Sequence, residues 1–232
     1  MNIKGFALDI DGTITEDGGI ISLDAAYTIR WLEKLGYRII FVTARSVWEG
    51  LALSTFLGTT KITVGENGGI VAKSPTDMIL LADISYSLRA YDYLSKKLDN
   101  VKEKPSFPRL TEVVLQRTFD REEGNRILKE GGLPIIINDS KYGYHLNYET
   151  INKAKGLLTA LKYFDLKASE IIAIGDSEID VPMFSACGYS VAMGNSSEYV
   201  KKNANFSVNA KMGNGFLEAI QHIVDRFFKG EG

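Results

Sequence analysis

The sequence predicts an α/β fold, with a doubly wound, Rossmann-like parallel-sheet core and a small inserted α+β domain. Apolar β-rich runs alternate with helical patterns over the first 79 residues and again from residue 151 onward. Such alternation favours parallel strands joined by right-handed crossovers. Between these stretches the pattern changes to helix, strand, helix, strand, strand, with a tight turn before the last strand, as in a small antiparallel unit. We therefore predict a core domain of residues 1–79 and 151–232 and a second domain of residues 80–150.

Each predicted element of the core follows from a residue pattern of its own. The first strand is the apolar run between residues 3 and 10, which Gly12 ends. Apolar residues at helical spacing follow over residues 23–35, and Gly36 is the expected C-cap. The remaining core strands are predicted at residues 38–42, 61–64, 171–174 and 189–193, and the remaining core helices at residues 47–57, 153–164, 179–186 and 215–228. In the inserted domain, helices are predicted at residues 84–98 and 122–130 and strands at residues 112–116, 134–138 and 144–147.

Composition narrows the class of protein. The chain has 232 residues, of which 45% are hydrophobic and 24% charged, as in an ordinary globular protein. A net charge of −2 without a basic block argues against a nucleic-acid partner. Cys187 is the single cysteine, which excludes a disulfide framework and a thiolate metal cage. No signal-peptide pattern and no apolar run of the ~18 residues of a membrane span are visible, so we predict no membrane partner and a cytoplasmic location. The sequence does not indicate the oligomeric state.

Two carboxylates follow the first strand directly. Asp9 and Asp11 are two residues apart, so their side chains point to the same side of the chain. They lie at the carboxyl end of the strand, the edge where open α/β sheets bind ligands. Their mutual repulsion favours a cation between them, and Mg²⁺ prefers oxygen ligands. Taken alone, a solvated Asp-Asp-Gly turn explains the same string equally well.

Polar residues also follow two other predicted strands. Thr43 places a hydroxyl beside the start of a helix, an arrangement that suits a phosphate, although simple helix capping explains a lone Thr better. Asp176 and Asp180 come after the strand at residues 171–174. As helix-capping carboxylates they would be unremarkable. Beside Asp9 and Asp11 they would complete an oxygen-rich cation site.

A lysine begins the helix that follows the inserted domain. Lys153 is the candidate, although a single Lys is usually a surface residue and Lys155 lies close enough to be confused with it. Four polar positions occur along the chain, each at the end of a predicted strand or the start of a predicted helix. Their joint occurrence favours a single shared site.

In this order the residues resemble the motifs of the haloacid dehalogenase superfamily of phosphotransferases, over nearly the whole chain. Residues 9–13 read DIDGT, matching the first motif, and Thr43 matches the second. Lys153 matches the third, and the fourth matches Gly175-Asp176 with Asp180. The insertion between the second and third motifs resembles the α+β cap of one subgroup. Its short length resembles the archaeal-type phosphoglycolate phosphatases.

The resemblance implies a role for each motif residue. Asp9 would be the nucleophile that forms an aspartyl-phosphate, and Asp11 the general acid and base. Thr43 and Lys153 would bind the phosphoryl oxygens. Gly12 would let backbone N–H groups approach the phosphate without a Cβ in the way.

The resemblance also implies a magnesium cofactor. Asp9, Asp176 and the backbone carbonyl of Asp11 would hold Mg²⁺, and Asp180 would support the metal shell and hold Lys153. The sequence departs from the pattern at Ile179, where relatives with this cap have Asn. The hydrogen bonds of that amide would be missing.

The implied activity is Mg²⁺-dependent hydrolysis of a small phosphorylated metabolite, with 2-phosphoglycolate as the expected substrate. A sugar-phosphate phosphatase or a phosphomutase of the same superfamily is the alternative. A signalling receiver domain, a different class, also has an acidic Mg²⁺ pocket, but the inserted domain and Asp11 argue against it. In the cap, Arg109, Arg117, Lys141 and His145 are candidates to pair with a substrate carboxylate, or else surface residues.

Overall fold

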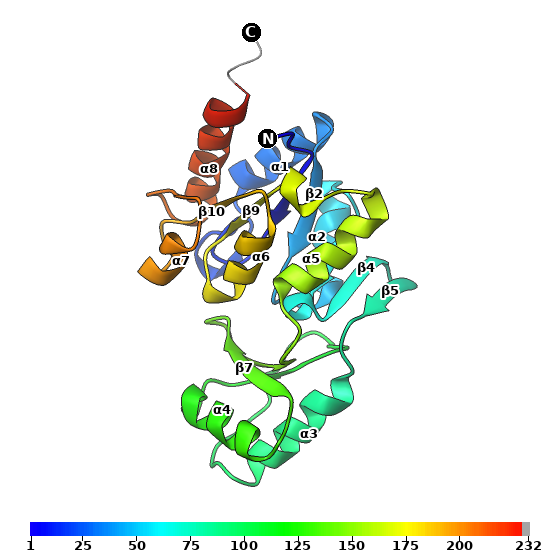
Figure 1. The fold of residues 1–232 in the computed structure, drawn as a ribbon, viewed down its shortest axis with the longest axis vertical. Coiled ribbons are helices and arrows are strands. Elements are labelled where there is room, and N and C mark those ends of the chain that lie inside the picture. The colour runs from blue at the N-terminus through cyan, green and yellow to red at the C-terminus, as the bar shows by residue number, and fades with distance from the viewer. Residues whose placement is uncertain (229–232) are drawn as a thin grey trace.

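The computed structural model describes residues 1–228, and its larger sheet has eight strands in the order β11-β10-β9-β1-β2-β3-β4-β5 (Figure 1). Every neighbouring pair from β11 to β3 is parallel, which confirms the predicted doubly wound core. The strands are β1 (Gly5–Leu8), β2 (Arg38–Val42), β3 (Thr63–Gly65), β4 (Ile70–Ser74), β5 (Asp77–Leu80), β9 (Ile171–Gly175), β10 (Tyr189–Ala192) and β11 (Phe206–Ser207).

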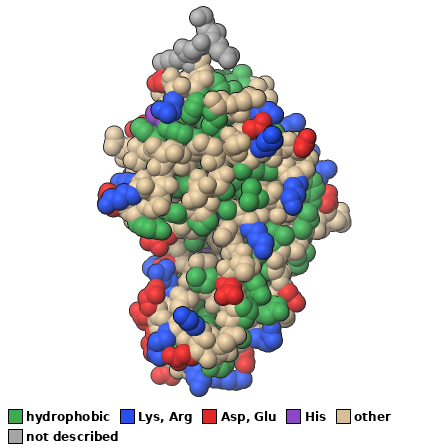
Figure 2. Space-filling view, viewed as in Figure 1, with side chains coloured by type: hydrophobic (Ala, Val, Ile, Leu, Met, Phe, Trp, Pro, Cys, Tyr) green, Lys and Arg blue, Asp and Glu red, His purple; other side chains and the backbone are tan. Residues whose placement is uncertain are grey.

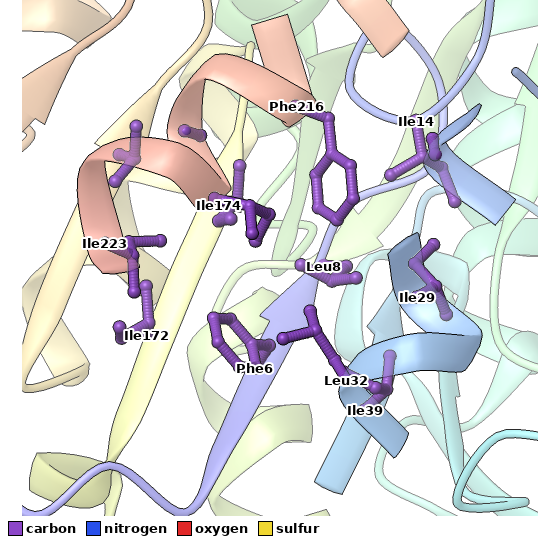
Figure 3. Close-up of a cluster of buried hydrophobic side chains, with 14 of the residues drawn as sticks. Phe6, Leu8, Ile14, Ile29, Leu32, Ile39, Ile172, Ile174, Phe216 and Ile223 are labelled. Atoms are coloured by element: carbon purple, nitrogen blue, oxygen red, sulfur yellow. The ribbon is translucent and has the colours of Figure 1, made fainter. Parts of the chain in front are cut away.

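Helices cover both faces of this sheet. On one face lie α1 (Leu23–Lys34), α2 (Val47–Leu57) and α8 (Met212–Phe227), and on the other lie α5 (Lys153–Leu161), α6 (Val181–Ala186) and α7 (Glu198–Lys202). Phe6 and Leu8 of β1 pack between α1 and α8, as Figure 3 shows, whereas Ala7 packs on the α5 side. Burial on both faces explains why these strands are almost continuously apolar.

The structure corrects the expected core at its edges. The hairpin of β4 and β5 was not predicted. Strand β4 pairs antiparallel with β3, and β5 pairs antiparallel with β4, so the hairpin extends the sheet by two strands. Helix α6 begins at Val181 rather than at Ile179, because Glu178–Asp180 form a separate 3₁₀ turn. The short elements α7 and β11 were also missed. Helix α8 begins three residues earlier than the pattern indicated.

A second, smaller sheet forms the inserted unit, which we call the cap. Its strands are β6 (Val113–Leu115), β7 (Ile135–Asp139) and β8 (Tyr144–Tyr148), antiparallel in the order β6-β8-β7. Helices α3 (Ile84–Ser95) and α4 (Arg121–Glu130) pack on it around their own apolar cluster. The predicted α+β cap is confirmed. It lies at the end of the molecule away from the N-terminus (Figure 1). The exact domain boundaries, at residues 79/80 and 150/151, stay a prediction.

The distribution of charge on the surface agrees with the small net charge of the chain. On the face shown in Figure 2, acidic and basic side chains are interspersed rather than gathered by sign. Within residues 1–228, none of the helices combines the length and the apolar character that crossing a membrane requires.

Candidate active site

The predicted polar residues meet at one edge of the core sheet, facing the cap. Because β1, β2 and β9 run parallel, their carboxyl ends lie at the same edge, which brings Asp9, Thr43 and Asp176 into one region. A cavity of about 520 Å³ separates this edge from the cap. Its walls include Asp9, Asp11 and Asp176 from the core and Arg109, Tyr142 and His145 from the cap.

Lys153 is fully buried between two carboxylates. Its Nζ donates hydrogen bonds to Oδ1 of Asp9 and to Oδ1 of Asp180, both at 2.5 Å. Burial alone would lower the pKa of Lys153, but the charges of Asp180 and Asp9 raise it above its ordinary value, so the amine is an ammonium. Asn152 caps α5 by accepting from the backbone N–H of Lys155, whose side chain is exposed. The structure thus distinguishes the two lysines.

Asp180 uses both carboxylate oxygens. While Oδ1 binds Lys153, Oδ2 accepts from the backbone N–H groups of Asp176 and Ser177, at 3.1 and 2.9 Å, and from the Ser177 hydroxyl at 2.8 Å. A Cβ on Gly175 would lie 2.6 Å from the Asp180 carboxyl carbon, so glycine is required there. Asp180 therefore fixes the turn after β9 and the position of Lys153 together.

An amide that the sequence did not single out reaches Asp176. Asn195 Nδ2 donates to Asp176 Oδ2 at 2.8 Å and to the carbonyl of Gly12 at 3.0 Å, and its Oδ1 accepts from the Met212 N–H at 3.0 Å. Asn195 follows β10 at the same sheet edge, which is the signal that could have found it. From the cap, Lys141 Nζ also donates to Asp176 Oδ2, at 2.9 Å.

The acidic cluster fits a hard divalent cation. Carboxylate oxygens of Asp9, Asp176 and Asp180 lie within 4.8 Å of one another. Burial and the charges of Asp180 and Asp176 raise the pKa of Asp9, although Lys153 opposes them. Burial and Asp180 likewise raise the pKa of Asp176, opposed by Lys141. Negative charge therefore exceeds what the two lysines neutralise, and an all-oxygen donor set suits Mg²⁺. Asp180 already accepts four hydrogen bonds, whereas Asp9 and Asp176 each accept two, so Asp9 and Asp176 are the better placed ligands.

Asp11 has a partner that the sequence did not indicate. Its two oxygens accept from Nε and Nη2 of Arg45, each at 2.7 Å, and Arg45 Nη1 donates to Glu49 at 2.7 Å. Asp11 is partly exposed on the cavity wall. The fork of Arg45 thereby fixes the orientation of the Asp11 carboxylate.

The two remaining motif residues, Thr43 and Gly12, are each held by a close contact. The Thr43 hydroxyl is buried and accepts from the Arg45 N–H at 3.0 Å, so Thr43 does act as a turn cap, while its own proton stays available for donation. Gly12 has φ +79°, and a Cβ there would lie 2.6 Å from Asp176 Oδ2. Only glycine lets the chain pass this close to Asp176.

The four cap candidates are placed differently. Arg109 and His145 line the cavity, and Lys141 contacts Asp176. Arg117 does not line the cavity; its side chain is 47% exposed and pairs with Asp139 at 2.9 Å.

The cap also contacts the core through its segment before β6. Glu66, which is buried at the end of β3, accepts from the N–H groups of Leu110 and Thr111, at 3.0 and 2.8 Å, and from the Thr111 hydroxyl at 2.7 Å. Ser46 at the start of α2 donates to the carbonyl of Pro108 at 3.1 Å. This segment forms one wall of the cavity.

Comparison with known proteins decides the family. The model of the haloacid dehalogenase-like hydrolases matches residues 6–114 and 110–220. This chain belongs to that family. It is 46% identical over 224 residues to the phosphoglycolate phosphatase of Nitrosopumilus maritimus, covering 96% of this chain and 97% of the relative. It is 33% identical over 225 residues to the phosphoglycolate phosphatase of Methanococcoides burtonii, covering 97% and 98%.

Two solved structures share the fold. The crystal structure of Thermoplasma acidophilum 0175 matches with a TM-score of 0.85 at 24% identity, covering 96% of this chain and 98% of that one. A haloacid dehalogenase-like hydrolase from Bacteroides thetaiotaomicron matches with a TM-score of 0.77 at 21% identity, covering 95% and 99%. The predicted family is confirmed, and the chain is an enzyme, a phosphatase of the haloacid dehalogenase type. The receiver-domain alternative is wrong.

One departure from the haloacid dehalogenase pattern now has a structural context. Ile179, where the motif resemblance leads to an expected Asn, lines the cavity. An amide does contact Asp176 in this hydrolase, and it comes from Asn195.

Proposed function

We propose that the chain is a Mg²⁺-dependent phosphate-monoester hydrolase that acts through an aspartyl-phosphate, and that its main substrate is 2-phosphoglycolate. The observation that supports this best is the position of Asp9. It lies buried against Lys153 on the floor of a cavity whose cap wall carries Arg109. The names of the relatives at 46% and 33% identity agree with this substrate.

In the proposed reaction Asp9 is the nucleophile. Its Oδ1 is held by Lys153 and its Oδ2 accepts only a 3.2 Å hydrogen bond from Thr13 within the described residues, so one oxygen is lightly engaged. Attack on phosphorus forms an aspartyl-phosphate and breaks the ester P–O bond. For this step one oxygen of Asp11 has to leave Arg45 and carry a proton; Asp11 then gives that proton to the leaving alkoxide, and later takes one from the water that hydrolyses the aspartyl-phosphate.

The remaining motif residues would bind the phosphoryl group and the metal ion. We propose that Lys153, Thr43 and the backbone at Gly12 bind the phosphoryl oxygens and balance the charge of the transition state. Asp9, Asp176 and the backbone carbonyl of Asp11 would hold Mg²⁺, with Asp180 as a supporting residue that also orients Lys153. When bound, Mg²⁺ neutralises the carboxylates and the phosphate, so that two anions can approach each other.

The cavity accommodates a small-molecule substrate. At about 520 Å³ it has room for a small ligand. A second carboxylate on such a ligand would be costly to bury without a cationic partner, and Arg109 is cationic. We propose that the enzyme hydrolyses a small phosphorylated acid and that it does so in the cytoplasm. We also propose that the core and the cap divide at residues 79/80 and 150/151.

A kinetic panel tests the substrate. We expect kcat/KM for 2-phosphoglycolate to exceed that for hexose phosphates and nucleotides at least about tenfold, equivalent to roughly 1.4 kcal/mol. A hexose phosphate or nucleotide that outranks phosphoglycolate would refute this substrate but leave the phosphatase assignment. Isomerisation of a sugar phosphate without phosphate release would favour the mutase.

The same assay tests the nucleophile. Asp9→Asn should remain folded and lose multiple turnover on every substrate of the panel, because an amide is a far weaker nucleophile than a carboxylate. Sustained turnover by the purified variant would contradict the assignment.

A further inference from the structure

A buried carboxylate in the cap organises the wall of the cavity. Glu112, just before β6, is fully buried, and its Oε1 accepts from Arg109 and from His145 Nδ1, the latter at 2.8 Å. Its Oε2 accepts from Asn147 at 2.5 Å and from Asn67 of the core at 3.1 Å. Burial alone would raise the pKa of Glu112, but His145, Arg109 and these hydrogen bonds lower it to about 2. Glu112 is therefore an ionised anchor with two donors on each of its oxygens.

Arg109 is held by two acceptors, and its Nε–H has none within the described residues. Its side chain is 8% exposed, and Nη1 donates both to Glu112 and to the carbonyl of Ala44, the latter at 2.7 Å. Its Nε is buried and has no hydrogen-bond partner within the described residues. Buried guanidinium N–H groups are rarely left without an acceptor, because the lost hydration is costly. Arg109 lines the cavity, so a ligand there lies beside a guanidinium that has a donor to spare.

His145 lies on the same wall and is held by the same anchor. Its Nδ1 contacts Glu112, and its Nε2 lies 2.8 Å from the Ser140 hydroxyl. His145 and Ser140 both line the cavity. Glu112 thus holds Arg109 and His145, from two separate segments of the cap, in fixed positions.

We infer that Arg109 is a specificity-determining residue that binds a carboxylate on the leaving group of the substrate, and that Glu112 is its positioning residue. This rests on the proposed function and assigns that function's selectivity to one side chain. A planar guanidinium matches a carboxylate better than an ammonium does. The bond to Ala44 fixes Arg109 beside Thr43, so the carboxylate receptor adjoins the proposed phosphoryl site, as a two-carbon phosphorylated acid requires.

Two substrates that differ by the carboxylate test the inference. We would measure kcat/KM for 2-phosphoglycolate and for ethyl phosphate, and take their ratio as the selectivity. Arg109→Lys keeps a charge beside Glu112 but loses the planar fork. It should lower the selectivity about tenfold to a hundredfold, through a raised KM for phosphoglycolate, and change ethyl phosphate hydrolysis less than about threefold.

Further variants separate selectivity from folding. Arg109→Gln combined with Glu112→Gln removes both buried charges together, which avoids an unpaired one, and should lose selectivity as well. Arg117→Lys, an exposed cap arginine outside the cavity, is the matched control and should keep it. Glu112→Gln alone should raise KM for phosphoglycolate while leaving kcat for ethyl phosphate unchanged.

The outcomes distinguish this inference from the proposed function. A wild-type enzyme with no preference for phosphoglycolate over ethyl phosphate would overturn the substrate proposal and this inference with it. A wild-type preference that Arg109→Lys and the double variant both retain would overturn only the role of Arg109. Equal losses on both substrates in Glu112→Gln would overturn the positioning role of Glu112.

Discussion

Replacing Lys153 by Met is predicted to damage both activity and stability, and the structure sets the scale of each effect. The ammonium donates two 2.5 Å hydrogen bonds to carboxylates inside the core. Losing a charge-balancing group in the transition state typically costs 10²- to 10³-fold in rate, about 3–4 kcal/mol. Removing one partner of a buried ion pair costs about 3–5 kcal/mol of folding stability, because Asp9 and Asp180 would remain buried without their cation.

The assay for this prediction measures both quantities on the same samples. Initial rates of phosphate release give kcat/KM, and denaturant unfolding gives the free energy of unfolding, so that rates are compared per folded molecule. Lys155→Ala is the matched control, because its side chain is exposed and lies about 200° around the helix from Lys153. We expect the control to stay within about 0.5 kcal/mol of the parent and to keep its activity.

A double variant separates the two effects. Lys153→Met with Asp180→Asn removes one buried negative charge as well, and should recover part of the stability but none of the activity. Recovery of activity with stability would refute a role for Lys153 in the reaction and leave it a structural residue. Loss of activity in Lys155→Ala but not in Lys153→Met would refute the placement of the third motif.

Three further predictions follow from the same site. EDTA should abolish activity, Mg²⁺ should restore it, and Ca²⁺ should inhibit because its coordination is larger and looser; full activity in metal-free buffer would contradict the Mg²⁺ proposal. Gly12→Ala should lower kcat/KM at least about tenfold and raise the Mg²⁺ requirement, because its Cβ would lie 2.6 Å from Asp176 Oδ2. Gly18→Ala, with φ +81° and open space around the new Cβ, is its control, and equal activity losses would show that backbone strain alone is responsible. Glu112 has its pKa lowered from 4.5 to about 2, so its stabilisation is complete above about pH 4.5 and is lost as the pH falls toward 2. Between pH 5 and pH 2 the parent should therefore lose roughly 3 kcal/mol more unfolding free energy than Glu112→Gln, and parallel pH curves for the two proteins would refute this.

The residues that the sequence located well are those fixed by local patterns. Asp9 and Asp176 each follow an apolar strand, and Lys153 begins a helix, so their places depend on element boundaries that nearby residues define. The parallel order of the strands then brings them to one edge. The same logic placed Thr43, although its observed hydrogen bond is the one expected of a simple turn cap.

The partners that were missed depend on contacts between distant segments. Asn195 and Gly12 are 183 positions apart. Glu112, just before β6, and His145, on the neighbouring β8, are 33 apart. No local pattern specifies such pairs, because strand register and cap placement are properties of the whole fold. The β4–β5 hairpin was missed for a related reason. Its short strands are recognisable only from the pairing of β4 with β3 and of β5 with β4.

The hydrogen bonds that Glu66 accepts from Leu110 and Thr111 limit how the two units can separate. The cap is connected to the core by two chain crossings, after β5 and after β8, and these alone would allow it to swing as a lid. Swinging would have to release a buried carboxylate from three donors, and each such bond to a charged group is worth about 1.5–3 kcal/mol. Even one released bond makes the open form at least roughly tenfold rarer than the closed form. We therefore expect ligands to enter and leave through the mouth of a nearly rigid chamber, which limits the enzyme to substrates small enough to pass.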